Sequence, residues 1–264
     1  MTNIMRPIPA NSALYLNDVL LYATTVDESF KILRQALDIM RNEGLTLNLT
    51  KCSFLKSKVT YLGYDIEHGT VKPGVDKTKA VKNFPVPKTV HQIRQFLGLT
   101  GYFRHFVQDY AIIAKPLTTL TKKNIPWKWE ADEDKAFCKL RDVLVSRPVL
   151  SLFNPDSSTE LHTDASQIGL AGILMQRGPD ERLHPVSYYS RRTADVERKY
   201  HSYELETLAV VESLRKFRSY LLGIRFTVVT DCNSIKSTRP GWKFRNLLLT
   251  SNTDLVVEWD TWMP

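Results

Sequence analysis

Three carboxylates stand at positions from which metal-dependent chemistry could be done. Asp164 and Asp231 each end an apolar, β-rich run and follow a threonine, and Glu206 lies 42 residues after the first and 25 before the second. Carboxylates gathered in one place repel each other unless a cation neutralises them, and sites with only oxygen ligands suit Mg²⁺. Two such ions could activate a water and stabilise the leaving oxygen of a phosphodiester. Spacing alone leaves open the alternative that all three are ordinary surface acids.

The elements that would position these carboxylates can be read from hydrophobic periodicity. Strands are predicted over residues 160–166, 169–176, 184–190 and 225–231, and one long helix from Ala194 to Leu222 is closed by Gly223. If the first and fourth strands are neighbours, both aspartates emerge at the same edge of the sheet. A carboxylate in the crossing helix could then face them.

The first half of the chain predicts a different mixture of elements. A hairpin is expected over Ala13–Ala23 with its turn at Asn17-Asp18, and a helix over Asp27–Gly44. Residues 45–71 read as strand, with a turn at His68-Gly69. A helix opens at Thr89, interrupted at Gly98 and Gly101. Further helices are predicted to end near Leu120 and to span Ala131–Ser146.

The charge of the chain is unevenly distributed. Lys and Arg number 36 and Asp and Glu number 28, but residues 75–123 alone hold nine basic and two acidic side chains. Because Tyr102, Phe103 and Phe106 lie among these cations, the segment suits a phosphate backbone. A solubilising face is the alternative reading.

Composition excludes several other classes of protein. The chain is 43% apolar and 24% charged, which is typical of a soluble globular protein of about two domains and not of a fibrous or low-complexity one. Its three cysteines form no CxxC pair, so neither a disulfide framework nor a zinc site is expected. No signal peptide or membrane span is evident, and an intracellular location, cytoplasmic or nuclear, is expected.

A set of short motifs, in collinear order over roughly residues 4–238, resembles the Pol polyprotein of gypsy-type LTR retrotransposons. Residues 163–166 (TDAS), 204–211 (ELETLAVV) and 230–232 (TDC) resemble its RNase H domain. Residues 15–18 (YLND) resemble the reverse transcriptase YxDD signature. The family's palm is similar to residues 51–54 (KCSF) and 61–64 (YLGY). Its thumb is similar to residues 96–104 (FLGLTGYFR) and 115–117 (KPL), and its tether to residues 126–150.

The resemblance implies a fold of class α+β or α/β. A reverse transcriptase palm remnant and a helical thumb would precede an incomplete RNase H-like mixed sheet with helices. The implied segments are 1–74 (palm, C-terminal part), 75–123 (thumb), 124–157 (tether or connection), 158–238 (RNase H-like domain) and 239–264 (an atypical tail, as if frameshifted).

The same resemblance implies roles for particular residues. Asp164, Glu206 and Asp231 would be catalytic and would hold two Mg²⁺ ions, for which Mn²⁺ could substitute, and would cut RNA paired to DNA. Asp18 would be a remnant of the polymerase site. The thumb would grip an RNA–DNA hybrid or template–primer duplex through Lys77, Lys82, Arg94, Gly98, Gly101, Tyr102, Arg104 and Lys115. Other parts of the Pol polyprotein are possible partners.

Three departures from the family's pattern bear on activity. Asn17 stands where the polymerase signature has an aspartate, and the family's other palm aspartate would lie upstream of this chain. The fourth RNase H carboxylate would fall beyond Pro264, unless Asp254 or Asp260 stands in for it. Members of the family are RNA-directed DNA polymerases that also have ribonuclease H activity. For this chain we expect no DNA synthesis and an impaired RNase H, with a catalytically dead nucleic-acid-binding relic as the alternative.

Overall fold

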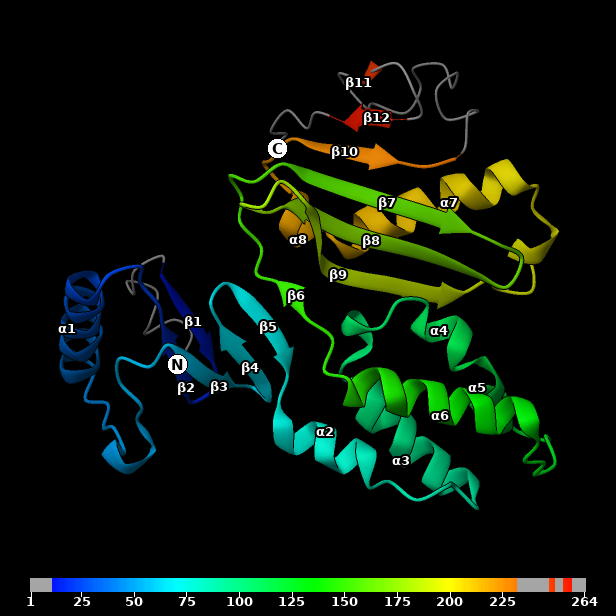
Figure 1. Cartoon of the computed structure of the whole chain (residues 1–264), viewed down its shortest axis with the longest axis horizontal. Coiled ribbons are helices and arrows are strands. Elements are labelled where there is room, and N and C mark those ends of the chain that lie inside the picture. Colours follow the sequence, from blue (N-terminus) through cyan, green and yellow to red (C-terminus); the bar gives the residue numbers. More distant parts are fainter. Residues whose placement is uncertain (1–10, 232–246, 250–253, 258–264) are drawn as a thin grey trace. The chain divides into compact units, whose positions relative to one another are not determined.

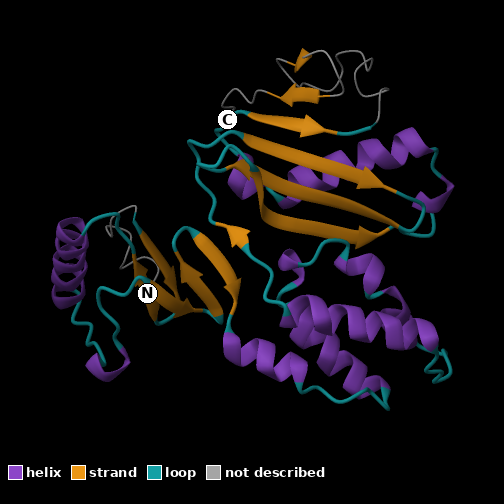
Figure 2. Ribbon diagram, viewed as in Figure 1, coloured by secondary structure: helices purple, strands orange, loops and turns teal. Residues whose placement is uncertain are grey.

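The computed structural model describes residues 11–231, 247–249 and 254–257 (Figures 1 and 2). Its contacts divide the chain into two compact units. The first is Met1–Leu62 with Ile66–His68, and the second is Gly63–Asp65 with Gly69–Pro264. Each unit is described by itself below. The five segment boundaries expected from the sequence stay a prediction.

The first unit begins with the predicted hairpin. Strands β1 (Ser12–Tyr15) and β2 (Asp18–Leu21) are antiparallel, and Tyr15 pairs with Asp18. The turn is therefore Leu16-Asn17, one residue earlier than expected, with Leu16 at a φ of 51°. The Tyr61 hydroxyl donates to the carbonyl oxygen of Ala13 at 3.3 Å and ties the hairpin to the later part of the unit.

Helix α1 (Val26–Asn42) confirms the helix predicted after the hairpin. The Thr25 hydroxyl accepts the backbone N–H of Glu28 at 3.2 Å and caps its first turn. Ile32, Ala36 and Met40 recur every four residues and are the buried face. After α1 come a 3₁₀ turn, η1 (Leu49–Lys51), and strand β3 (Lys58–Tyr61), so the prediction of strand from residue 45 was wrong for residues 45–57.

The second unit opens with short strands. These are β4 (Tyr64–Glu67), through which the division between the units passes, β5 (Thr70–Pro73) and β6 (Leu150–Ser151), which pairs antiparallel with β5. The predicted turn at His68-Gly69 is confirmed. Both residues have positive φ, 48° and 69°, which is the backbone of a two-residue hairpin loop.

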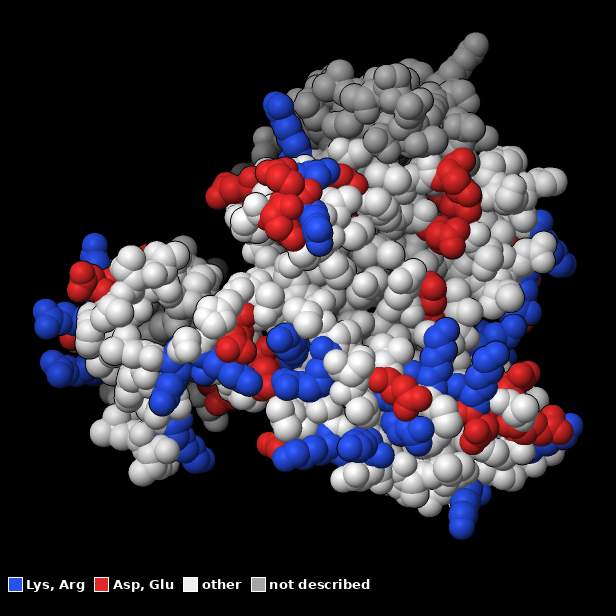
Figure 3. Space-filling model, in the orientation of Figure 1, with Lys and Arg blue, Asp and Glu red and all other residues white. Residues whose placement is uncertain are grey.

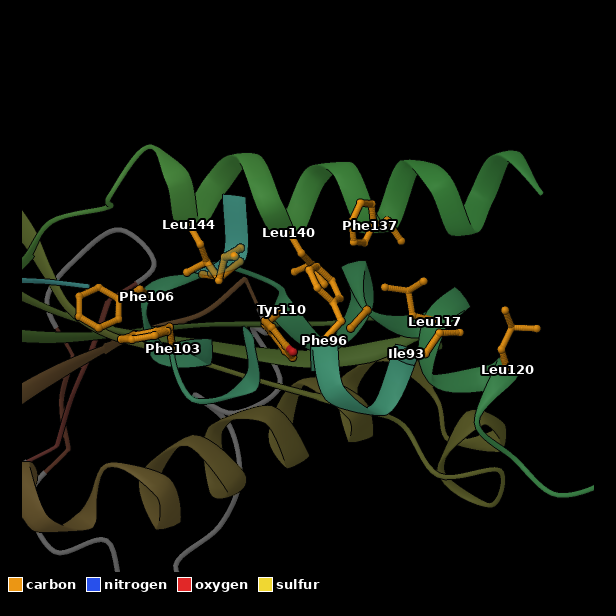
Figure 4. Close-up of a cluster of buried hydrophobic side chains, with 14 of the residues drawn as sticks. Ile93, Phe96, Phe103, Phe106, Tyr110, Leu117, Leu120, Phe137, Leu140 and Leu144 are labelled. Atoms are coloured by element: carbon orange, nitrogen blue, oxygen red, sulfur yellow. The ribbon is translucent and has the colours of Figure 1, made fainter. Parts of the chain in front are cut away.

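A helical segment follows and encloses the first core of this unit. Its elements are α2 (Val75–Lys82), α3 (Val90–Gly101), η2 (Arg104–Phe106), α4 (Tyr110–Ile113), α5 (Lys115–Leu120) and α6 (Ala131–Val145). Figure 4 shows side chains of α3 and α5 meeting those of α6, and Ile93, Phe96, Leu117, Phe137 and Leu140 are fully buried. Thr89 caps α3 as predicted. The expected interruption at Gly98 was wrong, because that residue lies inside the helix.

The last part of the unit is a mixed sheet with strand order β11-β12-β10-β7-β8-β9. Strands β7 (Thr159–Ala165), β8 (Gly169–Arg177) and β9 (Leu183–Arg192) are antiparallel neighbours, and β10 (Phe226–Val229) runs parallel to β7. All four were predicted. Strands β11 (Leu247–Leu249) and β12 (Asp254–Val257), within the segment expected to be atypical, extend the sheet beyond β10.

One helix packs along a face of this sheet. Helix α7 (Ser202–Lys216) contacts β7 and β8, and its Val210 joins Leu161, Leu174, Phe217 and Val228 in the second core (Figure 1). The expected single helix from Ala194 to Leu222 was wrong. The chain forms η3 (Glu197–Lys199), is extended at Tyr200, and is broken again at Phe217 before α8 (Arg218–Leu221).

The arrangement confirms the predicted mixed α and β class. Among the described residues, no helix is long and apolar enough to cross a membrane.

Candidate functional site: a carboxylate cluster at the end of a parallel strand pair

The two strands that carry the aspartates are neighbours. In the parallel pair of β7 and β10, His162 lies opposite Val229, so Asp164 and Asp231 each follow the paired position by two residues. Parallel strands end at the same edge of a sheet. Both aspartates therefore emerge together, as the sequence predicted, and both are exposed.

Glu206 reaches this edge from helix α7. Leu205 and Ala209 of the helix pack against Leu170 of β8, which fixes the rotation of the helix over the sheet. Oε1 of Glu206 then accepts the backbone N–H of Ala165, the residue after Asp164, at 3.2 Å. Glu206 is only 8% exposed, and its Oε2 atom is buried with no hydrogen-bond partner.

The electrostatics of the three groups are coupled. Burial, followed by the charges of Asp231 and Asp164, raises the pKa of Glu206 from 4.5 to about 7. A raised carboxyl pKa with like charges close by is a common property of sites that bind cations or transfer protons. The structure agrees with the prediction that these three residues lie at one edge of the sheet, whereas their catalytic and metal-binding roles stay a prediction.

The donor set fits a magnesium ion in its chemistry. All the side-chain atoms that could bind a metal are oxygens, and the buried Oε2 of Glu206 is an orphaned acceptor that a cation would satisfy. As the side chains stand, no group of three His, Cys, Asp or Glu within the described ranges is arranged to hold a metal ion. Asp164, Glu206 and Asp231 are the residues that would hold such an ion.

Close packing sets how near α7 comes to the sheet. Gly172 of β8 lies opposite Thr163 and beneath Ser213 of α7. A Cβ atom added at Gly172 would lie 2.8 Å from the Cβ of Ser213 and closer still to its hydroxyl. Only a glycine allows this approach, which brings Glu206 within reach of Ala165. The hydroxyls of Thr163 and Ser213 are both buried there without a hydrogen-bond partner.

The helical segment contacts the edge of the same sheet. Ser190 of β9 accepts the backbone N–H of Ala111 with its hydroxyl at 3.0 Å and a hydrogen bond from Arg104 with its carbonyl oxygen at 2.6 Å. Asp164, Ala171 and Ser190 are cross-strand partners, and therefore lie on one face. The segment predicted to hold nucleic acid is thus joined to the strand row that includes Asp164.

Most of the predicted nucleic-acid contacts lie at the surface of the helical segment. Lys77, Lys82, Arg94 and Tyr102 are exposed, and Lys115 is partly buried. Figure 3 shows Lys and Arg side chains over this part of the molecule, interspersed with acidic ones. The remaining predicted contacts are Gly98, exposed inside α3, Gly101 at its end, and Arg104.

Arg104 already has partners within the protein. Besides its bond to Ser190, its guanidinium lies over the ring of Tyr110, 5.6 Å from the centroid. A role in holding the helical segment to the sheet was missed by the sequence reading, since nothing in the motif around Arg104 identifies a partner 86 residues away.

The other predicted site residues lie elsewhere. Asn17 and Asp18 are exposed in the hairpin of the first unit, and burial together with the charge of Asp18 raises the pKa of Tyr61. Asp254 begins β12, where its backbone pairs with Val229. Asp260 lies outside the described residues.

The fold defines a class. A mixed sheet with a parallel central pair and a helix against one face is the arrangement expected of an RNase H-like domain. Residues 129–228 match the family described as "RNase H-like domain found in reverse transcriptase".

Two curated proteins that the chain resembles are transposon polyproteins. The chain is 37% identical, over 88% of its length, to the retrovirus-related Pol polyprotein from transposon 297 of Drosophila melanogaster. It is 32% identical, over 82% of its length, to the transposon Tf2-3 polyprotein of Schizosaccharomyces pombe. It spans only 22% and 16% of these two polyproteins. The chain is therefore related to a segment of retrotransposon Pol polyproteins that includes a reverse transcriptase RNase H-like domain.

Solved structures agree on the fold. Foamy viral protease-reverse transcriptase, solved as its dRH form with double-stranded DNA, matches 90% of the chain with a TM-score of 0.75 and 23% identity, and covers 42% of that protein's chain. The same viral protein in complex with an RNA/DNA hybrid matches 86% of the chain with a TM-score of 0.74, covering 31% of that protein's chain.

Proposed function

We propose that this chain is part of a reverse transcriptase and includes an RNase H-like domain that hydrolyses the RNA strand of RNA–DNA hybrids. The observation that carries the proposal is Glu206. A carboxyl that is 8% exposed, has one orphaned oxygen and lies beside two further acids is costly to keep unless a cation binds there.

Asp164, Glu206 and Asp231 would hold the metal. Bound Mg²⁺ supplies an activated water and stabilises the leaving oxygen of the phosphodiester. The chain's own contribution is position and charge. The Ala165 N–H fixes Oε1 of Glu206, while the edge of the sheet presents Asp164 and Asp231 to solvent, where a phosphate backbone can approach.

The basic segment 75–123 would bind the duplex. Nine cations against two acids suit a polyanion, and most of the named side chains are exposed. The solved structures with a similar fold support this choice of ligand, because the foamy viral protein was solved with double-stranded DNA and with an RNA/DNA hybrid. Binding of either duplex by this chain follows from the proposal.

DNA synthesis is not part of the proposed activity. Asn17 is neutral where the polymerase signature has an aspartate, so it offsets less of a metal's charge and Asp18 is left as the remnant of that site. Purified chain incubated with primer, template and deoxynucleotides should extend nothing. Extension abolished by Asp18→Asn would contradict this.

The test of the nuclease is cleavage of a labelled hybrid by the full chain, with Mg²⁺ or Mn²⁺ and with EDTA. Metal-dependent cutting that is lost in Asp164→Asn and Glu206→Gln, and kept in the surface control Asp156→Asn, supports the proposal. Cutting that survives in Asp164→Asn would overturn the site. The double change Asp254→Asn with Asp260→Asn tests whether a tail aspartate takes part.

A second candidate function is favoured by the absence of a metal-ready group of three among the described residues. On that reading the chain binds duplexes through residues 75–123 and does no chemistry. Wild-type chain that binds hybrid at low salt and cuts none with either metal would establish it.

A further inference from the structure

A further acid lies in the turn that precedes α4. Asp109 has a left-handed backbone, with a φ of 55°, and is partly buried. An aspartate in the position before a helix commonly caps it, because its carboxylate accepts a backbone N–H of the first turn. The side chain of Asp109 does not cap α4. Its carboxylate is therefore available for another role.

Ser190 of β9 takes the capping role instead. Its hydroxyl accepts the backbone N–H of Ala111, the second residue of α4, at 3.0 Å. Ser190 is only 2% exposed, so this hydrogen bond is shielded from water. The first turn of α4 is thus capped from the sheet and not by the aspartate that precedes it.

Helix α4 lies along β9 and reaches β8, the strand next to the one that carries Asp164 (Figure 1). Gly169 and Ala171 lie on one face of β8, because alternate residues of a strand share a face. A Cβ atom added at Gly169 would lie 2.9 Å from Cγ1 of Ile112 in α4. Ala171 pairs with Ser190 on one side and with Asp164 on the other. The start of α4 therefore lies against the face that Asp164 shares.

The charges of Asp109 and Asp164 act on each other across this contact. Burial, followed by the charge of Asp164, raises the pKa of Asp109, whereas Lys139 of α6 acts in the opposite direction. Carboxylates that lie close together repel each other unless a cation neutralises them. An independent observation points to a cation here, because Glu206 is 8% exposed and its buried Oε2 atom has no hydrogen-bond partner.

We propose that Asp109 adds its carboxylate to the divalent-cation site at the end of β7 and β10. The inference rests on the proposed function and adds to that site a residue of the basic segment 75–123. Affinity for a hard cation depends on how many carboxylates face it. The segment proposed to bind the duplex then also supports the ion, and a bound cation holds the start of α4 on the sheet.

The test measures Mn²⁺ binding to the full chain without nucleic acid, by isothermal titration calorimetry, together with the rise in Tm at saturating Mn²⁺. Asparagine tolerates a left-handed backbone as aspartate does, so Asp109→Asn removes the charge and keeps the turn. It should raise the Kd for Mn²⁺ about tenfold and reduce the rise in Tm. Asp156→Asn removes the same charge from an exposed turn and should leave the Kd within about twofold of wild type.

Glycine separates the carboxylate from the backbone. It adopts a positive φ without strain, so Asp109→Gly also keeps the turn while removing the side chain. It should weaken Mn²⁺ binding as much as Asp109→Asn does. Unchanged binding in both variants overturns the proposal. A loss in Asp109→Gly alone overturns it too, because the charge would then have no part in the effect.

Ser190 tests how the carboxylate is positioned. In Ser190→Ala the N–H of Ala111 loses its acceptor and draws the carboxylate of Asp109 into the ordinary cap, so Mn²⁺ binding should weaken. On the Asp109→Asn background the same change should weaken it no further. Losses that add in the double variant would show that Ser190 acts without Asp109, and would overturn the exchange of caps on which the proposal rests.

Hybrid cleavage separates this inference from the proposed nuclease. In an active enzyme, Asp109→Asn should cut slowly at limiting Mn²⁺ and recover at saturating Mn²⁺. An active nuclease whose Kd for Mn²⁺ is unchanged in Asp109→Asn overturns this inference alone. If wild-type chain binds Mn²⁺ and cuts no hybrid, the nuclease fails and the comparison of Kd values still decides the role of Asp109. If it binds neither Mn²⁺ nor Mg²⁺, both proposals fall.

Discussion

At the scale of single residues, the main property of the candidate site is the burial of the Glu206 carboxyl. Glu206 lies with Oε1 bonded to the chain and Oε2 without a partner, next to two exposed acids. Its raised pKa, about 7, has a direct consequence for stability. The folded protein binds a proton at Glu206 in a pH range where the unfolded chain, with a pKa near 4.5, has already released it.

The first prediction follows from the upward shift of the Glu206 pKa. As pH rises from about 4.5 to 7, the folded state loses stability relative to the unfolded chain, and above pH 7 the loss is constant. Glu206→Gln removes this titration. In EDTA, the free energy of unfolding of Glu206→Gln minus that of wild type should therefore increase by roughly 2 kcal/mol across this range. Urea unfolding at pH 4.5, 6 and 8 measures it, and a flat difference would contradict the raised pKa.

The sequence predicted the placement of the three acids at one sheet edge better than it predicted the surrounding elements, while their roles stay a prediction. Two β-rich runs ending in Thr-Asp are a local pattern, and the helix between them is long enough to cross back, so the meeting of Asp164, Glu206 and Asp231 follows. The start of the helix was predicted at Ala194 and lies at Ser202. There the Glu204 carboxylate accepts the backbone N–H of His201 at 2.8 Å, a local contact that hydrophobic periodicity does not reveal.

At the scale of elements, the distance between α7 and the sheet decides whether Glu206 reaches Ala165. A second prediction concerns Gly172, whose added Cβ would meet Ser213. Gly172→Ala should destabilise the fold by about 1–3 kcal/mol and lower hybrid cleavage. Ser213→Gly on that background should restore part of the loss. Equal stability of Gly172→Ala and wild type in thermal unfolding would show that the helix can shift freely.

A third prediction concerns the ion pair between Arg147, two residues after the end of α6, and the buried Asp65 in β4. Arg147 also donates to the carbonyl of Pro73 at 3.1 Å, so it joins the helical segment to the small sheet. Arg147→Met leaves a buried carboxylate without its cation and should cost about 3 kcal/mol. The control is the pair of Arg215 and Glu212, in which the arginine is exposed, and Arg215→Met should cost under about 1 kcal/mol.

Partners of this kind mark the limit of sequence reasoning. Asp65 and Arg147 are 82 residues apart, and no periodicity or spacing connects them. The pairing of β12 with β10 was missed for the same reason. The predicted end of the long helix was wrong because α7 ends at Phe217, whose side chain packs in the hydrophobic core.

At the scale of the whole molecule, the proposed duplex binding rests on the distribution of charge. The excess of cations is concentrated in residues 75–123, and the side chains of Lys77, Lys82 and Arg94 are exposed, although Arg94 also donates to the carbonyl oxygen of Thr121 at 3.2 Å. Arg104 belongs to the structure of the second unit, because it bonds Ser190 and covers Tyr110. A binding test that includes Arg104 would therefore mix loss of affinity with loss of fold.

The fourth prediction is that duplex binding depends on salt through these three cations. Each phosphate contact contributes about 0.9 to the slope of log Kd against log salt concentration on B-form DNA. The triple change of Lys77, Lys82 and Arg94 to alanine should thus reduce the slope by about 2–3 units, equally for duplexes of unrelated sequence. The control is a triple alanine variant that removes the same charge from the first unit, at Lys31, Lys51 and Lys56. It should leave the slope within about one unit of wild type. Because both triples remove three charges, a general effect of net charge would lower the two slopes alike, and that result would exclude residues 75–123 as a dedicated duplex-binding surface.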